Sequence, residues 1–153
     1  MEKPTKKNKT YIELLKEDHD KVKALFKKFK KTKEDSSKRT IVETILKELT
    51  VHAKAEEEII YPEFRKVLKE DLVDEADIEH HLAKVLIEEL SQMKPGDDHY
   101  EARVTVLGEI IDHHVEEEEG EIFPKAKKEI RNPEEITARL AARKKSLTAE
   151  IEI

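Results

Sequence analysis

Apolar side chains recur every three or four positions along most of the chain, which is the period of one helix face. The breaks between these segments are short and polar, as in KEDSS and KPGD. The pattern predicts long helices over roughly residues 10–31, 37–69, 72–93 and 98–129, and a fifth beginning at Asn132. Short loops favour antiparallel neighbours. We therefore expect an all-α fold, an antiparallel up-down-up-down four-helix bundle with an added C-terminal helix.

The two predicted helix pairs repeat one another. In the first pair the inward positions are Ile12, Leu15, His19, Val22, Phe26 and Phe29, then Ile45, Leu49, His52, Ala53, Glu56, Ile60 and Pro62. Adding 61 to the first set and 62 to the second gives Val73, Ala76, His80, Ala83, Ile87 and Leu90, then Leu107, Ile111, His114, Val115, Glu118, Ile122 and Pro124. The bundle should thus have an internal two-fold repeat at residues 10–129, with a tail at 1–9 and a C-terminal helix and tail at 130–153.

Polar residues interrupt the apolar stripes at equivalent points of both halves. His19 and His80 lie on the inward faces of the first and third helices. The second and fourth helices each carry a His and a Glu four residues apart, a spacing that places both side chains on one side of a helix. The six candidate ligands are His19, His52, Glu56, His80, His114 and Glu118.

A plain core explains one such histidine but not the whole set. An ionised carboxylate without a partner costs several kcal/mol to bury, and no Lys or Arg lies on the inner stripes. Metal ions would keep the carboxylates ionised and the imidazoles neutral. Oxygen and nitrogen donors without sulfur suit iron, manganese or zinc, and six side chains exceed the needs of one tetrahedral zinc. We expect two metal ions, with iron preferred and manganese or zinc as alternatives.

Composition narrows the possible classes of function and partner. Charged residues make up 43% of the 153 residues, aromatic residues 5%, and there is no cysteine, so disulfides and thiol chemistry are excluded. The net charge of −6 gives no support to a nucleic-acid partner. No run approaches the roughly 18 apolar residues of a membrane span, and the N-terminus does not resemble a signal peptide. We expect no nucleic-acid partner, no membrane association and a cytoplasmic location.

Four segments, EDHDKV, HAKAEEEIIYP, EHHLAKVLIEEL and HVEEEEGEIFP, resemble the hemerythrin-like HHE cation-binding domain over about residues 10–128. The resemblance implies a four-helix bundle with a non-heme di-iron centre, two iron ions (Fe2+/Fe3+) with an oxo or hydroxo bridge, held by the six residues above. Oxygen-carrying hemerythrins place two histidines one turn apart on the third helix, where this chain has Ala76 before His80. This difference argues against reversible oxygen carriage. The Glu-x-x-His motif of ferritin-like proteins is absent.

Two functions follow as hypotheses. In the first, a di-iron protein binds or reacts with dioxygen, peroxide or nitric oxide, and whether it turns over as an enzyme stays open. In the second, metal loading of an iron- or oxygen-responsive module controls contacts with a protein partner or a second copy through the C-terminal segment.

Several residues at the edge of this pattern have open roles. His81 is an alternative or additional ligand, and Asp77 could hold an imidazole or reach the metal. Glu57 and Glu119 are candidate acceptors beside the ligands, or part of an entry path for iron. Tyr61 is expected to pack in the core, with a role at the metal as the minority interpretation. Finally, Pro62 and Pro124 should bend or break their helices.

Overall fold

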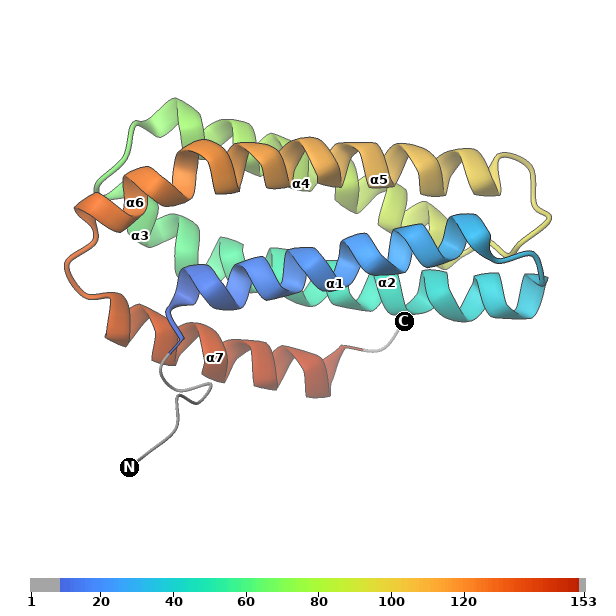
Figure 1. Cartoon of the computed structure of the whole chain (residues 1–153), viewed down its shortest axis with the longest axis horizontal. Helices are drawn as coiled ribbons and strands as arrows, with labels where there is room; N and C mark the ends of the chain where they lie inside the picture. Colours follow the sequence, from blue (N-terminus) through green and yellow to red (C-terminus); the bar gives the residue numbers. More distant parts are fainter. Residues whose placement is uncertain (1–8, 152–153) are drawn as a thin grey trace.

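The computed structural model describes residues 9–151, and almost all of them are helical (Figure 1). The elements are α1 (Tyr11–Lys31), α2 (Asp35–Ala55), η2 (Glu56–Ile60), α3 (Tyr61–Arg65), α4 (Glu70–Ser91), α5 (Tyr100–Glu117), η3 (Glu118–Ile122), α6 (Phe123–Glu129) and α7 (Pro133–Glu150). The expected all-α bundle with a C-terminal helix is confirmed. Most of the predicted tail at residues 1–9 lies outside the described residues. No helix within residues 9–151 has the length and apolar character needed to cross a bilayer.

Local sequence determines where the first and last helices begin. Thr10 and Glu13 form a capping box at the start of α1, in which the Thr10 side chain accepts from the Glu13 N–H and the Glu13 side chain accepts from the Thr10 N–H. This exchange satisfies two of the N–H groups that a helix start leaves free. At α7, Asn132 is the N-cap and Pro133 the first helical residue, as the sequence indicates.

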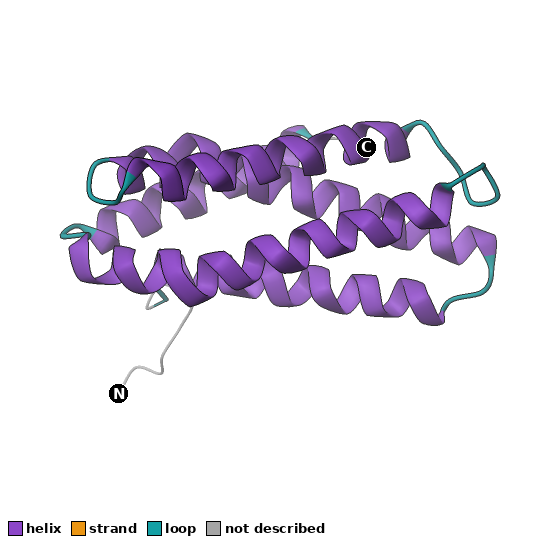
Figure 2. Ribbon diagram, turned by 90° about the horizontal axis from the view of Figure 1, so that it is seen from above, coloured by secondary structure: helices purple, strands orange, loops and turns teal. Residues whose placement is uncertain are grey.

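The four long helical rods form a closed ring around one core. α1 packs against α2 and α5, and α4 packs against α5 and α2, so the rods run side by side in the view from above (Figure 2). α7 packs against α1, α2 and η2, on the side of α1 away from α4 and α5 (Figure 1). The C-terminal helix therefore covers one face of the first helix pair.

Two apolar clusters fill the ring and leave a polar layer between them. One contains Leu15, Phe64 and Ala76 together with residues of α7, and the other contains Val22, Leu49 and Ala83. On α1, His19 lies between Leu15 of the first cluster and Val22 of the second. His80 lies in the same way between Ala76 and Ala83 on α4. Apolar packing thus separates the layer that holds the histidines from both ends of the bundle.

The observed second helix differs from its predicted range of 37–69. It begins earlier, at Asp35, and the helical path ends at Arg65, after which the Lys66 and Val67 N–H groups bond three residues back, to the Glu63 and Phe64 carbonyls at 3.2 and 3.0 Å. Glu70 and Asp71, expected in a loop, form the first turn of α4, where carboxylates favour the positive end of the helix dipole. Similarly, α5 begins at Tyr100 rather than Asp98, after His99 in a left-handed conformation (φ 63°).

The two prolines do not break their helices. Each follows a five-residue π-helical turn, η2 or η3, as the second residue of the helix that continues from it, α3 or α6. Each π turn begins at a candidate ligand, Glu56 or Glu118, and closes with a bond from the N–H five residues later, that of Tyr61 or Phe123, to the glutamate carbonyl. A proline nitrogen cannot donate and its ring crowds the carbonyl four residues back, and the wider π turn accommodates it.

Candidate metal centre

The structure brings all six candidate ligands into the polar layer. His19 comes from α1, His52 from α2 and Glu56 from η2; their repeat counterparts come from α4, α5 and η3. None of the six exposes more than 8% of its surface, and both glutamates are fully buried. In residues 9–151 neither glutamate forms an ion pair with a Lys or Arg; their partners are histidines. The charges of the centre are therefore balanced from within.

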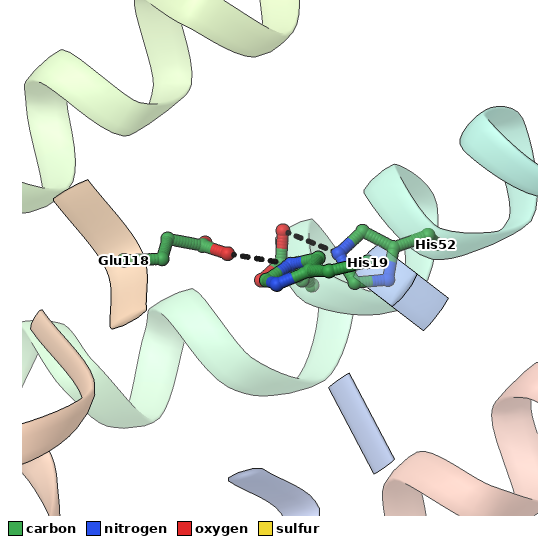
Figure 3. Close-up of side chains that lie close together, drawn as sticks. His19, His52 and Glu118 are labelled. Atoms are coloured by element: carbon green, nitrogen blue, oxygen red, sulfur yellow. Dashed lines mark ion pairs between the residues drawn. The ribbon is translucent and has the colours of Figure 1, made fainter. Parts of the chain in front are cut away.

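The six residues form two overlapping groups that share both glutamates. His19 and His52 form one group with Glu56 and Glu118, and His80 and His114 form the other with the same glutamates; within each group the donor atoms lie within 4.8 Å of one another. Figure 3 shows His19, His52 and Glu118 converging, with the His19 Nε2 atom 3.2 Å from Glu118 Oε1. On the other side, His80 Nε2 lies 3.1 Å from Glu56 Oε1. Each of the two groups offers the nitrogen and oxygen donors that could hold a cation.

Several of these donor atoms have no hydrogen-bond partner among the described residues. They are His19 Nε2, His52 Nε2, Glu56 Oε2 and Glu118 Oε1, and all are buried. Leaving a buried polar atom unpaired costs about 1–3 kcal/mol. The four residues make up the group around His19, in which His19 Nε2 and Glu118 Oε1 lie 3.2 Å apart without forming a hydrogen bond, and a cation there would give these donors a partner. The residues present therefore fit the metal ions that the sequence implies.

Each histidine is oriented by a carboxylate on its other ring nitrogen. The Nδ1–carboxylate pairs are His19–Glu119 (2.7 Å), His52–Asp18 (2.8 Å), His80–Glu57 (2.8 Å) and His114–Glu79 (2.8 Å). A carboxylate at Nδ1 fixes the ring and its tautomer, and makes the other nitrogen a better metal donor. All four Nε2 atoms consequently face the centre.

Sequence reasoning found half of these carboxylates. The prediction that Glu57 and Glu119 act as acceptors beside the ligands is confirmed. Asp18 and Glu79 were missed, although each directly precedes a candidate ligand, His19 or His80, and the repeat offset of 61 relates them. Their matched placement was the signal that could have found them.

A family model described as the hemerythrin HHE cation-binding domain matches residues 10–126. The chain belongs to this family. A DNA nickase of Nostoc sp. is 32% identical over 111 residues, which are 72% of this chain and 32% of that protein. An uncharacterized hemerythrin-like protein of Schizosaccharomyces pombe is 25% identical over 122 residues, 78% of this chain and 60% of that one. The hemerythrin-like chain thus spans only about a third to three fifths of these relatives.

A crystal structure of a hemerythrin HHE cation-binding domain-containing protein from Mycobacterium kansasii has the same fold. The superposition gives a TM-score of 0.80, at 23% identity, and covers 93% of this chain and 89% of that one. The 93% coverage exceeds the share of the chain within the family match at residues 10–126, so the likeness extends into the helix α7 that follows the bundle.

Tyr61 makes the two halves of the hemerythrin-like centre different. Its hydroxyl donates to Glu118 Oε2 at 2.6 Å and lies 3.2 Å from Glu56 Oε1 and from His80 Nε2. The residue equivalent by the repeat, Phe123, has no hydroxyl and instead stacks on the His19 ring at 6.0 Å between centroids. The expectation that Tyr61 packs in the core holds for its ring, and the hydroxyl reaches the centre as well.

Two other candidates do not join either group. His81 is exposed, and Asp77 pairs with Arg65 on the surface. Adjacent helical residues diverge by about 100°, so His80 and His81 cannot both face the centre. The repeat identified the inward residue of this pair correctly.

Protons balance the charges of the metal-free centre. Burial lowers the pKa of His52, but Glu56 and Asp18 outweigh burial and raise this pKa to about 10. Burial raises the pKa of Glu56, but His52 and the neighbouring histidines hold it well below its usual value. Imidazolium–carboxylate pairs therefore stabilise the centre in the absence of metal. Because a metal ligand must be deprotonated, metal binding here would release protons.

A cavity of about 90 Å³ adjoins the four histidines. Its deeper wall is mainly apolar, with Val22, Leu49, Ala83, Ile87 and Ile111. The exposed side chains of Lys54 and Lys84 also line it, so the cavity reaches the surface between α2 and α4. Since a cavity of about 150 Å³ holds benzene, this one suits ligands of only a few atoms.

Proposed function

We propose that this hemerythrin-like chain holds two iron ions and that this centre binds or reacts with a small oxidant, namely dioxygen, peroxide or nitric oxide. The observation that carries the proposal is the pair of overlapping donor groups built around two shared, fully buried glutamates. The small apolar cavity beside the histidines supports the size and the weak polarity of the proposed ligand.

The donor set assigns a role to each residue. His19 and His52 would hold one ion, His80 and His114 the other, and Glu56 and Glu118 would contact both. Two histidines and two shared carboxylates leave an iron ion short of six donors, so each ion keeps room for a ligand. Bound iron would supply the change of oxidation state that a reaction with an oxidant requires.

The protein would control access, orientation and protons. The apolar clusters on either side exclude bulk water from the layer. The carboxylates at Nδ1 hold the imidazoles in place, and the Tyr61 hydroxyl, 2.6 Å from Glu118, holds a proton beside the centre. Burial, Glu118 and Glu56 raise the pKa of Tyr61 well above its usual value, so the phenol stays protonated and can act as a hydrogen-bond donor.

Metal analysis and an optical spectrum of protein purified without chelator would test the proposal. We expect about two iron ions per chain and a ferric absorption that changes on anaerobic reduction and returns on adding dioxygen, peroxide or nitric oxide. Zinc or manganese in place of iron would overturn the iron assignment. The exposed Glu116→Gln change is the matched control for Glu56→Gln and Glu118→Gln, which should each lose metal.

A plain helical bundle gives the opposite result. In that case the parent protein would be colourless and free of bound metal, and Glu56→Gln and Glu118→Gln would not differ from Glu116→Gln in metal content. Reduced protein that consumes none of the three oxidants would count against the reactive function alone.

A metal-responsive binding module is the second candidate. It is favoured by a chain of contacts in which Lys144 of α7 pairs with Asp18 at 2.6 Å and Asp18 pairs with His52. Metal loading could thereby influence how α7 docks and what it contacts.

This chain matches only 32% of the length of the Nostoc DNA nickase, so the similarity gives no support to a DNA-nicking activity of this chain. The expectations of no nucleic-acid partner and a cytoplasmic location stay predictions.

A further inference from the structure

A third group of side chains that could hold a metal ion lies outside the buried centre, on the outer face of α4 and α5. It consists of Glu79, His113 and Glu117, with one donor atom of each within 4.8 Å of the others. The His113 side chain is 62% exposed, whereas Glu117 is 34% and Glu79 only 17% exposed. The group is open to solvent on its His113 side and rooted in the protein on its Glu79 side.

Glu79 connects this group to the buried centre. Its Oε2 atom lies 2.6 Å from His113 Nδ1, and its Oε1 atom lies 2.8 Å from His114 Nδ1. Glu117 Oε1 lies 3.5 Å from His113 Nε2. Glu79 can therefore face a cation with one oxygen while the other oxygen keeps its contact with the buried imidazole.

The internal repeat shows that packing does not require these residues. The positions equivalent to His113 and Glu117, at an offset of 62, are Val51 and Ala55. Both are buried in the apolar cluster that includes Ile136 and Leu140 of α7. The second half lacks this packing, and there the chain carries a His–Glu pair four residues apart, one position before the ligand pair His114/Glu118.

Charge compensation also differs between the halves. Asp18, the repeat equivalent of Glu79, has Lys144 of α7 at 2.6 Å in addition to its histidine. In the part of the chain that the structure describes, Glu79 and Glu117 pair only with histidines. In the described second half, no Lys or Arg takes the place beside Glu79 that Lys144 of α7 takes beside Asp18.

We propose that Glu79, His113 and Glu117 form an exchangeable site for a divalent cation, separate from the two buried metal positions. One imidazole and two carboxylates suit Zn2+, Fe2+ or Mn2+. The three protein donors leave one side of the site open to solvent, so water completes the coordination shell of the ion and the ion exchanges readily. The ion lies on the face that α7 leaves open, one carboxylate away from His114.

Equilibrium dialysis of the full chain against Zn2+ tests the site. The parent protein should bind one weak equivalent beyond the metal that survives dialysis into metal-free buffer. His113→Gln and Glu117→Gln should lose this equivalent and keep the retained metal, while the adjacent exposed variant Glu116→Gln should keep both. The ring signals of His113 in NMR spectra should shift as the weak equivalent binds.

Equal zinc binding by the parent, His113→Gln and Glu117→Gln proteins would overturn the proposal. So would a weak equivalent that leaves the His113 ring signals unchanged, or one that Glu116→Gln removes as well. The result is independent of the di-iron proposal, because loss of the buried centre would appear as missing retained metal in every variant, without changing the difference of one equivalent between them.

Discussion

Two buried tyrosines place their hydroxyls in opposite surroundings. Tyr61 donates to Glu118 and also lies near Glu56, His80 and His114. Tyr11 is 2% exposed, and its hydroxyl has no hydrogen-bond partner among the described residues. Burial raises the Tyr11 pKa to about 12. The same Tyr→Phe change should therefore affect stability in opposite directions at the two sites.

We expect Tyr11→Phe to raise the free energy of unfolding by about 1 kcal/mol. The change removes a buried hydroxyl that has lost its water without gaining a partner, while the ring keeps its contact with Phe64 at 6.1 Å between centroids. Urea denaturation of the metal-free protein measures the difference. A loss of stability would mean that the hydroxyl has a partner that this structure does not show.

Tyr61→Phe should instead destabilise the metal-free protein by about 1–3 kcal/mol, the cost of removing a hydrogen bond to a buried charged group. The same urea experiment measures it, with Tyr11→Phe as the control for a change of identical chemistry. If Tyr61→Phe leaves the unfolding midpoint unchanged or raises it, the hydroxyl of Tyr61 does not hold Glu118 as described.

At the scale of single residues, the sequence predicted which side chains point inward, but only some of the residues to which they bond. The apolar stripes and their repeat were enough to separate His80 from His81 and His114 from His113. The Tyr61 hydroxyl escaped prediction because its position depends on the π turn, which no periodicity revealed. In a regular α-helix, residues five apart diverge by about 140°, so Glu56 and Tyr61 would not face the same point.

The π turns are the elements that shape the centre. Each π turn contains one residue more than an α-helical turn. The aromatic residue five positions after the glutamate therefore faces the polar layer, Tyr61 in one half and Phe123 in the other. Such turns are often found at functional sites. The sequence signal was the repeated proline, which we interpreted as a bend or break because proline in a helix usually causes one.

Gly108 in α5 and Gly120 in the π turn η3 that follows it allow a matched test of packing. Nothing lies within 4 Å of a Cβ built on Gly120 in η3, whereas a Cβ on Gly108 in α5 would meet the Phe26 ring at 3.3 Å. Gly120→Ala should stabilise the protein by about 0.5–1 kcal/mol through the lower entropy of the unfolded chain. Thermal unfolding should show a smaller gain or a loss for Gly108→Ala. A loss for Gly120→Ala would indicate that η3 needs the freedom of glycine.

On the scale of the whole molecule, α7 breaks the symmetry of the repeat. It is held against the first half by ion pairs of Arg139 with Glu63, Arg143 with Glu58 and Lys144 with Asp18. The sequence predicted this helix and its start, because Asn132, Pro133 and the acidic first turn are local signals. Its docking position depends on contacts between residues more than 70 positions apart, and no local pattern encodes those.

The contact between Lys144 and Asp18 gives α7 a direct effect on the proposed metal centre. Burial raises the Asp18 pKa, but His52 and Lys144 outweigh burial and lower it, so Asp18 stays ionised and holds His52 Nδ1. Lys144→Gln removes one of these two partners. We expect metal release to a chelator to become faster by up to about tenfold. Loss of the carboxylate itself typically weakens metal binding by about 10–100-fold, and loss of its cation partner should have a smaller effect.

Three variants separate this effect from a general loss of charge on α7. Lys145→Gln removes an exposed neighbouring cation and should release metal at the parent rate, whereas Lys144→Arg should restore slow release because it keeps a cation beside Asp18. Equal release by Lys144→Gln and Lys145→Gln would show that α7 does not act on the centre. A selective effect of Lys144→Gln would mean that the contact of α7 with Asp18 slows the release of metal from the centre.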